Sequence, residues 1–321
     1  MKQHNSISVV LPSYNGMPLI KQSVESVLRQ SFTTFELVIC DDNSTDGTYQ
    51  FLASINDSRV KLLKNENNLG LFPNLNNAIK SAQNDLIHLW AQDDIMLPDC
   101  LAETINFHNK HTDLAFAFSK YLIIDGGGKI IGENKINPND LMSVEGHAVT
   151  SLVAGSVSGN IANISLKRSD LEEVGYFNEQ MKYSGDFDMW CRLSSKKPVG
   201  IIQQHLIKLR SHSGQLSKSP KMWIYRLKEN EEIMNSFLSR VSKEKLRYVK
   251  TGIKWRIYNQ YFSLFIQLVK MGRYGLAKKY AVELHQQSNL LTQFCRWSVF
   301  NIFKLFKKEK WLLNNLYYKK L

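Results

Sequence analysis

The sequence predicts an α/β fold, with a mostly parallel sheet flanked by helices and an α-helical C-terminal extension. Short apolar runs alternate with amphipathic segments from residue 7 onwards, which is the pattern of successive strand and helix units. Loops rich in Asp and Asn follow these runs, at the positions where parallel sheets bind ligands. The composition changes near residue 220. We therefore expect a sheet domain at 1–220 and a basic helical region at 221–321.

Several apolar runs have the length and residue types of strands. They cover 7–11, 35–40, 60–63, 86–90, the hairpin 114–124 with 129–131, and 198–209. Helical patterns follow Pro18, cover 45–55 and about 73–82, and begin again near Asp99 and Asp186. Ser44 or Thr45 is expected to cap the helix at 45–55. The segment from 137 to 166 has no clear pattern. Its Gly155, Ser156, Gly159 and Asn160 suit a loop or strand edge close to a ligand, but loops without a ligand use the same residues.

The charge is divided unevenly along the 321 residues. Lys and Arg exceed Asp and Glu by 12 overall; residues 1–221 carry 21 basic and 23 acidic side chains, and residues 222–321 carry 20 and 6. The last Asp is Asp188, so any chemistry that uses Asp lies in the first part. The four cysteines are far apart, without zinc-type spacing, and the polar N-terminus leads straight into a strand. We expect a protein of the cytoplasmic side with neither signal peptide nor membrane span.

Two adjacent acids, Asp93 and Asp94, directly follow the apolar run that ends at Trp90. Two anions at a strand end favour a divalent cation, since Mg²⁺ and Mn²⁺ commonly bind through one or two carboxylates and the phosphates of a substrate. The alternative is a solvated turn before the helix that Pro98 and Asp99 open. No GxGxxG or P-loop motif occurs, so a nucleotide would be held by its base and ribose at the first two loops and by its phosphates at the third.

Two further polar sites lie later in the chain. Asp186 falls in the first turn of a predicted helix, where it could act in catalysis or simply favour the helix dipole. The loop from Arg210 to Ser217 contains His212, and its cation, imidazole and hydroxyls suit a pyrophosphate and its metal, although an exposed polar loop is an equal alternative.

Taken together, residues 6 to 217 resemble glycosyltransferase family 2, the inverting enzymes of the GT-A fold. The resemblance rests on Val9 to Asn15, Phe35 to Asp46, Asn68-Leu69-Gly70 with Asn76, Gln92 to Pro98, and Gly185-Asp186 before Trp190. It implies that Asp42 hydrogen-bonds the nucleotide base, that Asp93 and Asp94 hold the metal and diphosphate, and that Asp186 is the catalytic base. It also implies that His212 helps to hold the metal. The expected donor-binding residues are Pro12, Tyr14, Asn15, Asp42, Asn76, Asp93 and Arg210.

Two departures from the family pattern stand out. The usual metal motif reads Asp-x-Asp-Asp, and Ala91 replaces its first acid, which leaves open whether Asp93 or Asp94 is the direct ligand. The Glu that often precedes the catalytic Asp is Gly185. In the expected chemistry an acceptor hydroxyl attacks the anomeric carbon while the nucleoside diphosphate leaves from the opposite face, which inverts the configuration.

The C-terminal third reads as helices broken near Gly252, at 271–272 and at 288–289. Near its end Val299, Ile302, Phe303 and Phe306 share one face of a helix, and Asn301, Lys304 and Lys308 the other. With Trp297 and Trp311 nearby, this pattern fits an interfacial helix on an anionic membrane. A helical cap with a solvated basic face is the alternative, and no nucleic-acid-binding motif is present. A homo-oligomer is left open.

The sequence thus predicts a metal-dependent hexosyl- or N-acetylhexosaminyltransferase that uses Mn²⁺ or Mg²⁺. It would act on a nucleoside-diphosphate sugar and a glycan or lipid-linked acceptor, peripherally at the cytoplasmic face of the plasma (inner) membrane, in surface polysaccharide or glycolipid synthesis. A sugar nucleotidyltransferase is the enzymatic alternative, but such an enzyme needs a Gly-rich basic loop where the chain has Pro12 to Asn15. The other alternative is a catalytically inactive glycan- or lipid-binding subunit, because Ala91 replaces the first acid of the metal motif.

Overall fold

A computed structural model describes residues 3–134, 139–158, 160–212, 214–215 and 218–317. The chain divides into two compact units. The first unit comprises Met1–Ser143 and Ser158–Ser213, and the second comprises Val144–Val157 and Gly214–Leu321. The chain therefore passes into the second unit at 144–157 and then returns to the first. The single boundary between 220 and 221 that the sequence suggests does not include this excursion.

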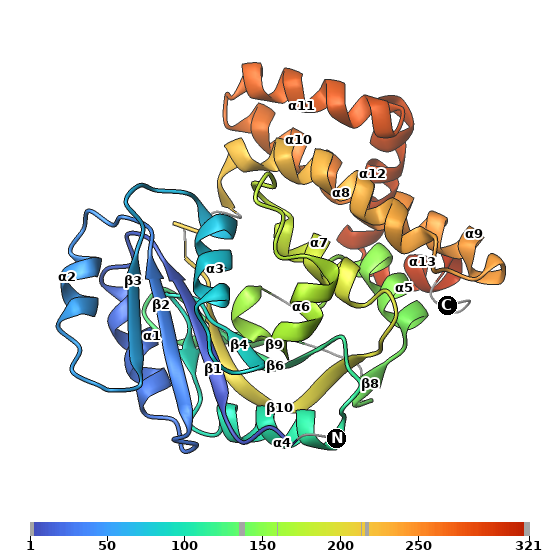
Figure 1. Cartoon of the computed structure of the whole chain (residues 1–321). Helices are drawn as coiled ribbons and strands as arrows, with labels where there is room; N and C mark the ends of the chain where they lie inside the picture. The colour runs from blue at the N-terminus through green and yellow to red at the C-terminus, as the bar shows by residue number, and fades with distance from the viewer. Residues whose placement is uncertain (1–2, 135–138, 159, 213, 216–217, 318–321) are drawn as a thin grey trace. The chain divides into compact units, whose positions relative to one another are not determined.

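The described part of the first unit contains one ten-stranded mixed sheet (Figure 1). Its strands are β1 Ile7–Ser13, β2 Phe35–Asp41, β3 Val60–Lys64, β4 Leu86–Leu89, β5 Ile95–Met96, β6 Phe116–Ile124, β7 Ile130–Glu133, β8 Leu141–Met142, β9 Ile164–Lys167 and β10 Val199–Arg210. The order is β3-β2-β1-β4-β9-β6-β10-β5, with β7 beside β6 and β8 beside β10.

The direction of the strands explains where the polar loops meet. β1 is parallel to β2 and β4, β2 to β3, and β10 to β6. β9 is antiparallel to both of its neighbours, β4 and β6. The strands on either side of β9 therefore run the same way, and the carboxyl ends of β1, β2, β4 and β10 lie along the same edge of the sheet.

Helices cover the sheet on both faces (Figure 1). α1 (Leu19–Leu28), α2 (Thr48–Ala53) and α4 (Cys100–Lys110) share one apolar cluster with Ile7, Val9 and Leu11 of β1. Because strand side chains alternate between faces, α3 (Leu71–Lys80), which packs on β1 and β2 from outside that cluster, covers the opposite face. The other helices of this unit are η1 (Ile161–Asn163), α6 (Arg168–Val174) and α7 (Gly185–Leu193).

The predicted α/β class, the strands of the parallel sheet and the β6–β7 hairpin are confirmed. One local prediction is wrong: neither Ser44 nor Thr45 caps α2, which begins at Thr48 behind Gly47. The Ser44 hydroxyl instead donates to Asp41 Oδ1 at 2.6 Å, a local contact three residues back along the chain that competes with capping. The region 137–166, for which the sequence showed no clear pattern, contains β8, α5 (Val144–Ala154), η1 and the start of β9, a central strand.

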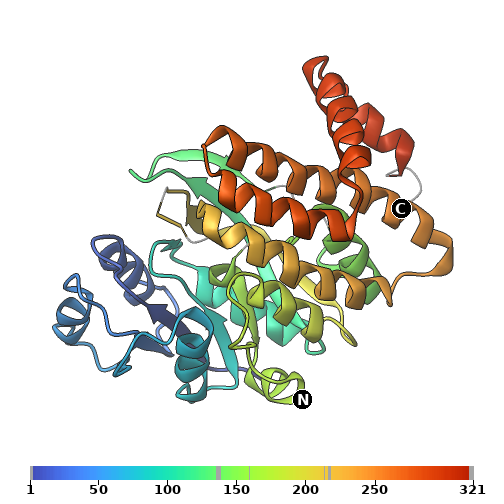
Figure 2. The ribbon, with the colours of Figure 1, turned by 90° about the horizontal axis from the view of Figure 1, so that it is seen from above.

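The second unit is helical, and Figure 2 shows its orange helices running alongside one another. Its elements are α5 Val144–Ala154, η3 Pro220–Met222, α8 Trp223–Leu238, α9 Lys243–Gly252, the π-helical turn Ile253–Ile257, α10 Tyr258–Lys270, α11 Tyr274–Gln287, α12 Leu290–Leu305 and α13 Glu309–Leu316. The predicted breaks at 271–272 and 288–289 are present. The chain does not break at Gly252, where a Cβ would approach Val153 and Tyr317, but continues into the π-helical turn.

Candidate active site

The loop after β1 is bonded to the loops after β2 and β4. Asn15, which has a left-handed φ of 47°, donates its N–H to Ser44 Oγ at 2.9 Å and accepts from the Thr45 N–H at 2.9 Å. The exposed Tyr14 donates its N–H to Gln92 Oε1 at 2.9 Å, and Gln92 Nε2 donates back to the Tyr14 carbonyl at 3.0 Å. Pro12 is buried in β1 just before this loop. The structure therefore brings the first three predicted donor-binding segments together.

Asp42, at the end of β2, is buried and bonded within the chain. Its Oδ1 accepts from Asn65 Nδ2 at 2.8 Å and from the Leu69 N–H at 2.9 Å, and its Oδ2 accepts from the Gly70 N–H at 2.8 Å. Gly70 has a φ of 92° and precedes α3. Asp42 thus fixes the N-terminus of α3, and its contact with a nucleotide base remains a prediction.

The two adjacent acids have different surroundings. The carboxylate of Asp93 is 21% exposed, and its Oδ2 lies 2.9 Å from Nε2 of His212, which is 27% exposed. Asp94 is 1% exposed; its Oδ1 accepts from the Arg210 N–H at 2.7 Å and its Oδ2 from Asn160 Nδ2 at 3.1 Å. Burial, and next the charge of Asp93, raises the pKa of Asp94 to about 7, while these hydrogen bonds act in the opposite direction. Asp93 therefore keeps the more accessible carboxylate.

Arg210 is buried, and its guanidinium is engaged mainly with backbone. Nε donates to the Asp93 carbonyl at 2.8 Å, Nη1 to the Gly126 carbonyl at 3.0 Å, and Nη2 to Gln22 Oε1 at 2.9 Å. The side chain therefore fixes the turn that carries Asp93. Contact with a diphosphate remains a prediction for this residue.

Asp186 lies in the first turn of α7, as expected, and is half-buried. Its Oδ1 accepts from the Phe187 N–H at 2.7 Å. Asp188 instead pairs with Arg192 at 2.8 Å, and Arg192 donates to the carbonyls of Val174, Gly175 and Tyr176 at the end of α6. Asp188 thus has a structural partner of its own.

Asn76 is buried on α3 and holds the chain that leads to α7. Its Nδ2 donates to the Phe177 carbonyl and to Glu179 Oε1, both at 2.9 Å, and its Oδ1 accepts from the Phe177 N–H at 3.0 Å. Its role at the donor remains a prediction.

Comparisons with known proteins point to one family. The family model described as "Glycosyl transferase family 2" matches residues 8–164, from β1 to the start of β9. The segment 8–164 belongs to glycosyltransferase family 2.

Proteins similar to the chain include an uncharacterized glycosyltransferase of Rickettsia conorii, 27% identical over 76% of the chain and 40% of that protein. The chain thus spans about two fifths of that relative's length. The UDP-Glc:α-D-GlcNAc-diphosphoundecaprenol β-1,3-glucosyltransferase WfgD of Escherichia coli is 28% identical over 77% of the chain and 94% of that protein. The crystal structure of S. aureus TarS 1–349 with UDP-GlcNAc has a TM-score of 0.58 at 19% identity, covering 80% of the chain and 73% of TarS, and supports the GT-A fold.

One of the two departures from the family pattern has a structural explanation. Phe72 occupies the space beside Gly185, where a Cβ would lie 2.6 Å from its ring. An acid at this position would therefore need Phe72 to move. Ala91 is half-buried against the core of the first unit, and its carbonyl accepts from Ser23 Oγ at 2.7 Å.

A divalent cation fits this site in part. A carboxylate oxygen and an imidazole nitrogen, both ligands of Mn²⁺, face each other at Asp93 and His212. Within the described ranges, which omit Ser213, Leu216 and Ser217 of the same loop, no three His, Cys, Asp or Glu side chains come together. Two protein ligands are sufficient for Mg²⁺ or Mn²⁺ when substrate phosphates and water complete the coordination.

The sequence interpretation missed three contributors. Gln92 was part of the motif but had no role, Asn65 was not considered, and Asn160 was only one of several loop residues. Gly159, another of these loop residues, lies outside the described residues. Only the polar composition of these segments could have pointed to them, since each partner is distant in sequence.

Proposed function

We propose that the chain transfers a sugar, with inversion, from a nucleoside-diphosphate sugar to a glycan or lipid-linked acceptor in surface polysaccharide or glycolipid synthesis. The observation that carries the proposal is the meeting of the polar loops after β1, β2, β4 and β10 at one edge of the sheet, with Asp93 beside His212. Family membership supports it, as does a relative that is named for the use of UDP-Glc.

The donor would lie along this edge, with its base and ribose near Tyr14, Asn15 and Asp42 and its diphosphate near Asp93. Asp93 and His212 are the proposed cation ligands, because both are accessible. Both oxygens of Asp94 are already bonded, so it is the weaker candidate. A Mn²⁺ or Mg²⁺ ion there would neutralise the leaving diphosphate.

Asp186 is the proposed general base. Gly185 packs on Phe72 in the first turn of α3, and the same end of α3 is held by Asp42. This packing ties the start of α7 to the loop after β2. A carboxylate there would take the proton of the acceptor hydroxyl, a contribution typically of about 10²–10⁴ in rate.

We further propose that the second unit binds an anionic membrane surface at which a lipid-linked acceptor is presented. In WfgD the acceptor that the name gives is a diphosphoundecaprenol lipid. No helix in the described ranges is long and apolar enough to cross a bilayer. The binding surface would be the α12 apolar face, an exposed row that recurs on one side of the helix: Leu291, Phe294, Val299, Ile302, Leu305 and Phe306.

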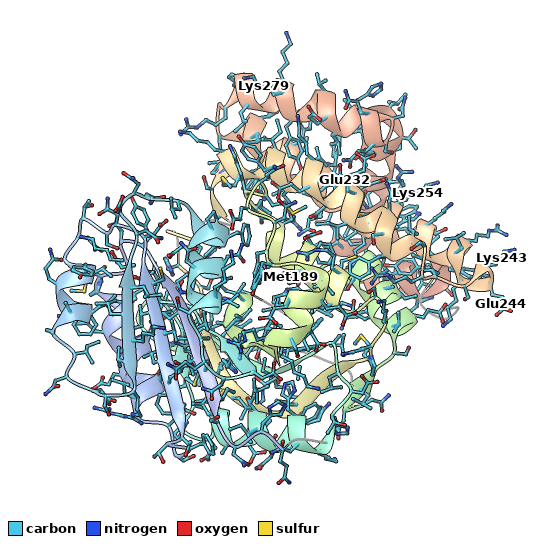
Figure 3. All side chains as sticks on the ribbon, in the orientation of Figure 1. Met189, Glu232, Lys243, Glu244, Lys254 and Lys279 are labelled. Atoms are coloured by element: carbon cyan, nitrogen blue, oxygen red, sulfur yellow. The ribbon has the colours of Figure 1, made fainter. Side chains whose placement is uncertain are left out.

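Charge favours the same surface. Exposed lysines, Lys304, Lys307, Lys308 and Lys310, lie at the end of α12 and the start of α13. Lys243, Lys254 and Lys279, on other helices of the second unit, are exposed as well and add to its positive charge (Figure 3). Each basic residue near an anionic surface contributes roughly 1 kcal/mol. The sequence placed Phe303 on the exposed apolar face. In the structure its ring instead stacks on Trp311, with ring centroids 6.0 Å apart.

The decisive experiment incubates the purified chain with a panel of nucleotide sugars, with and without Mn²⁺, and measures release of nucleoside diphosphate. Mn²⁺-dependent hydrolysis of one donor is expected. Release of pyrophosphate on incubation with a sugar phosphate and a nucleoside triphosphate would indicate a nucleotidyltransferase instead. Binding of glycan or lipid without turnover of any donor would indicate an inactive subunit.

A further inference from the structure

Asn160 is the side-chain partner that Asp94 has in addition to the backbone of Arg210. Its Nδ2 donates to Asp94 Oδ2 at 3.1 Å, while its Oδ1 accepts from the Ala162 N–H at 3.0 Å and caps η1. One amide thus uses its donor on the acid and its acceptor on the backbone. The two functions can be separated by substitution.

The loop that carries Asn160 is held firmly in the first unit. Asn163, at the end of η1, accepts from the Ser119 N–H at 3.1 Å and donates to the Ser119 carbonyl at 2.8 Å, which pins η1 to β6. The chain has just returned from the second unit, because Ser158 is the first residue after the segment 144–157. The position of Asn160 is therefore fixed by β6 and η1.

Asp94 and Asp93 are held by complementary contacts. Asn160 and the Arg210 N–H bind the two oxygens of the Asp94 carboxylate, and Arg210 Nε binds the Asp93 carbonyl. These contacts leave the turn little freedom. The Asp93 carboxylate, which makes none of them, is directed to His212.

We propose that Asn160 is a positioning residue of the cation and diphosphate site: by holding buried Asp94, it fixes the turn from which Asp93 faces His212. This inference rests on the proposed function. Nothing in the mechanism requires Asn160 to touch the donor. Hydrogen-bonded partners of metal-site carboxylates typically contribute about 10–100-fold in metal affinity.

The test is Asn160→Ser, which keeps an oxygen to cap η1 but cannot reach Asp94. Binding of UDP is measured by calorimetry across a Mn²⁺ titration and in EDTA. We expect the apparent affinity for Mn²⁺ to fall about 10–100-fold, while UDP binding in EDTA and the urea midpoint stay close to wild type. A merely structural role would lower the midpoint and both affinities together.

Asn109→Ser is the matched control, because Asn109 makes two comparable bonds to the backbone of His4 away from the acids. If Asn160→Ser does not fold, Asn160→Thr provides the same test, since Asn160 has the extended backbone that Thr favours. In an Asp94→Asn background, Asn160→Ser should add little.

Mn²⁺ affinity within twofold of wild type in a folded Asn160 variant would overturn the inference and leave the proposed function standing. Wild-type protein without any Mn²⁺-dependent binding of UDP or other nucleoside diphosphates would instead refute the proposed cation site itself.

Discussion

In the first unit the polar side chains after the strands bond to one another, whereas in the second unit the basic side chains mostly project to solvent. Asp42, Asp94 and Arg210 are buried and partnered within the chain. Among the described residues of the second unit, ion pairs join Lys228 to Glu283 and Lys245 to Glu145, yet residues 222–321 carry 20 basic side chains.

The apolar side chains show the same contrast. Met189 of α7 is fully buried in the first unit (Figure 3), while Leu305 of α12 is 81% exposed in the second. Ordered polar groups suit chemistry, because they need no rearrangement when charge develops. Exposed cations beside exposed apolar groups suit a broad anionic surface. Substitutions in one unit should therefore leave the function of the other intact.

The largest effect is expected from Asp93→Asn in the first unit. Transfer should fall to background and Mn²⁺-dependent binding of nucleoside diphosphate should be lost, because the accessible carboxylate ligand is removed. Asp99→Asn, six residues on and exposed, should leave both unchanged. Activity is measured by diphosphate release and binding by calorimetry. Full activity of the wild type in excess EDTA would show that no metal is needed.

Asp186→Asn should lower kcat about a hundredfold or more, since a general base typically contributes that much. The KM for the donor should change little, because the donor is bound elsewhere along the sheet edge. Asp188→Asn is the control: it loses the Arg192 ion pair and is expected to cost up to about 1 kcal/mol of stability while kcat stays near wild type. An Asp186 variant within threefold of wild type in kcat would reject the assignment.

In the second unit, the double variant Ile302→Glu/Phe306→Glu should release the protein from anionic liposomes in a sedimentation assay. The loss should be about tenfold or more in partitioning, because two apolar side chains no longer enter the interface. Donor hydrolysis should persist. Gln286→Glu/Asn314→Glu adds the same charge at exposed positions outside the α12 apolar face and should matter less. Wild-type protein that ignores anionic liposomes at low salt would leave α12 as a contact for another protein.

The smallest effect concerns packing in the first unit. Gly185→Ala should lower the free energy of unfolding by about 1–3 kcal/mol, because its Cβ would lie 2.6 Å from the Phe72 ring. Urea unfolding measures this change. The cost should be smaller when Gly185→Ala is introduced into Phe72→Leu, since the shorter side chain leaves room. Equal costs in both backgrounds would mean that Phe72 does not occupy this space.

The sequence determined most of the strands, their order along the chain and the acids at their ends, although β5, β8 and β9 were not predicted. These are local patterns: apolar runs of strand length, Asp-Asp after Trp90, and Asp186 at a helix start. Such patterns can be recognised in the sequence because side chains alternate along a strand and recur with helical spacing along a helix. The resemblance to glycosyltransferase family 2 then gave roles to Asp42, Asp93 and Asp186. The basic composition of the last hundred residues was equally readable.

Tertiary structure alone decided which of these side chains are buried and hydrogen-bonded within the protein. Asp94 is buried because Asn160 and Arg210, 66 and 116 residues away, supply its hydrogen bonds. No local signal predicts a partner at such a distance, because the partner is set by which strands become neighbours. β9 shows the same limit: four residues of an unpatterned region become a central strand because β4 and β6 leave a place between them. Similarly, α5 joins the second unit although the sequence around it carries no change in charge.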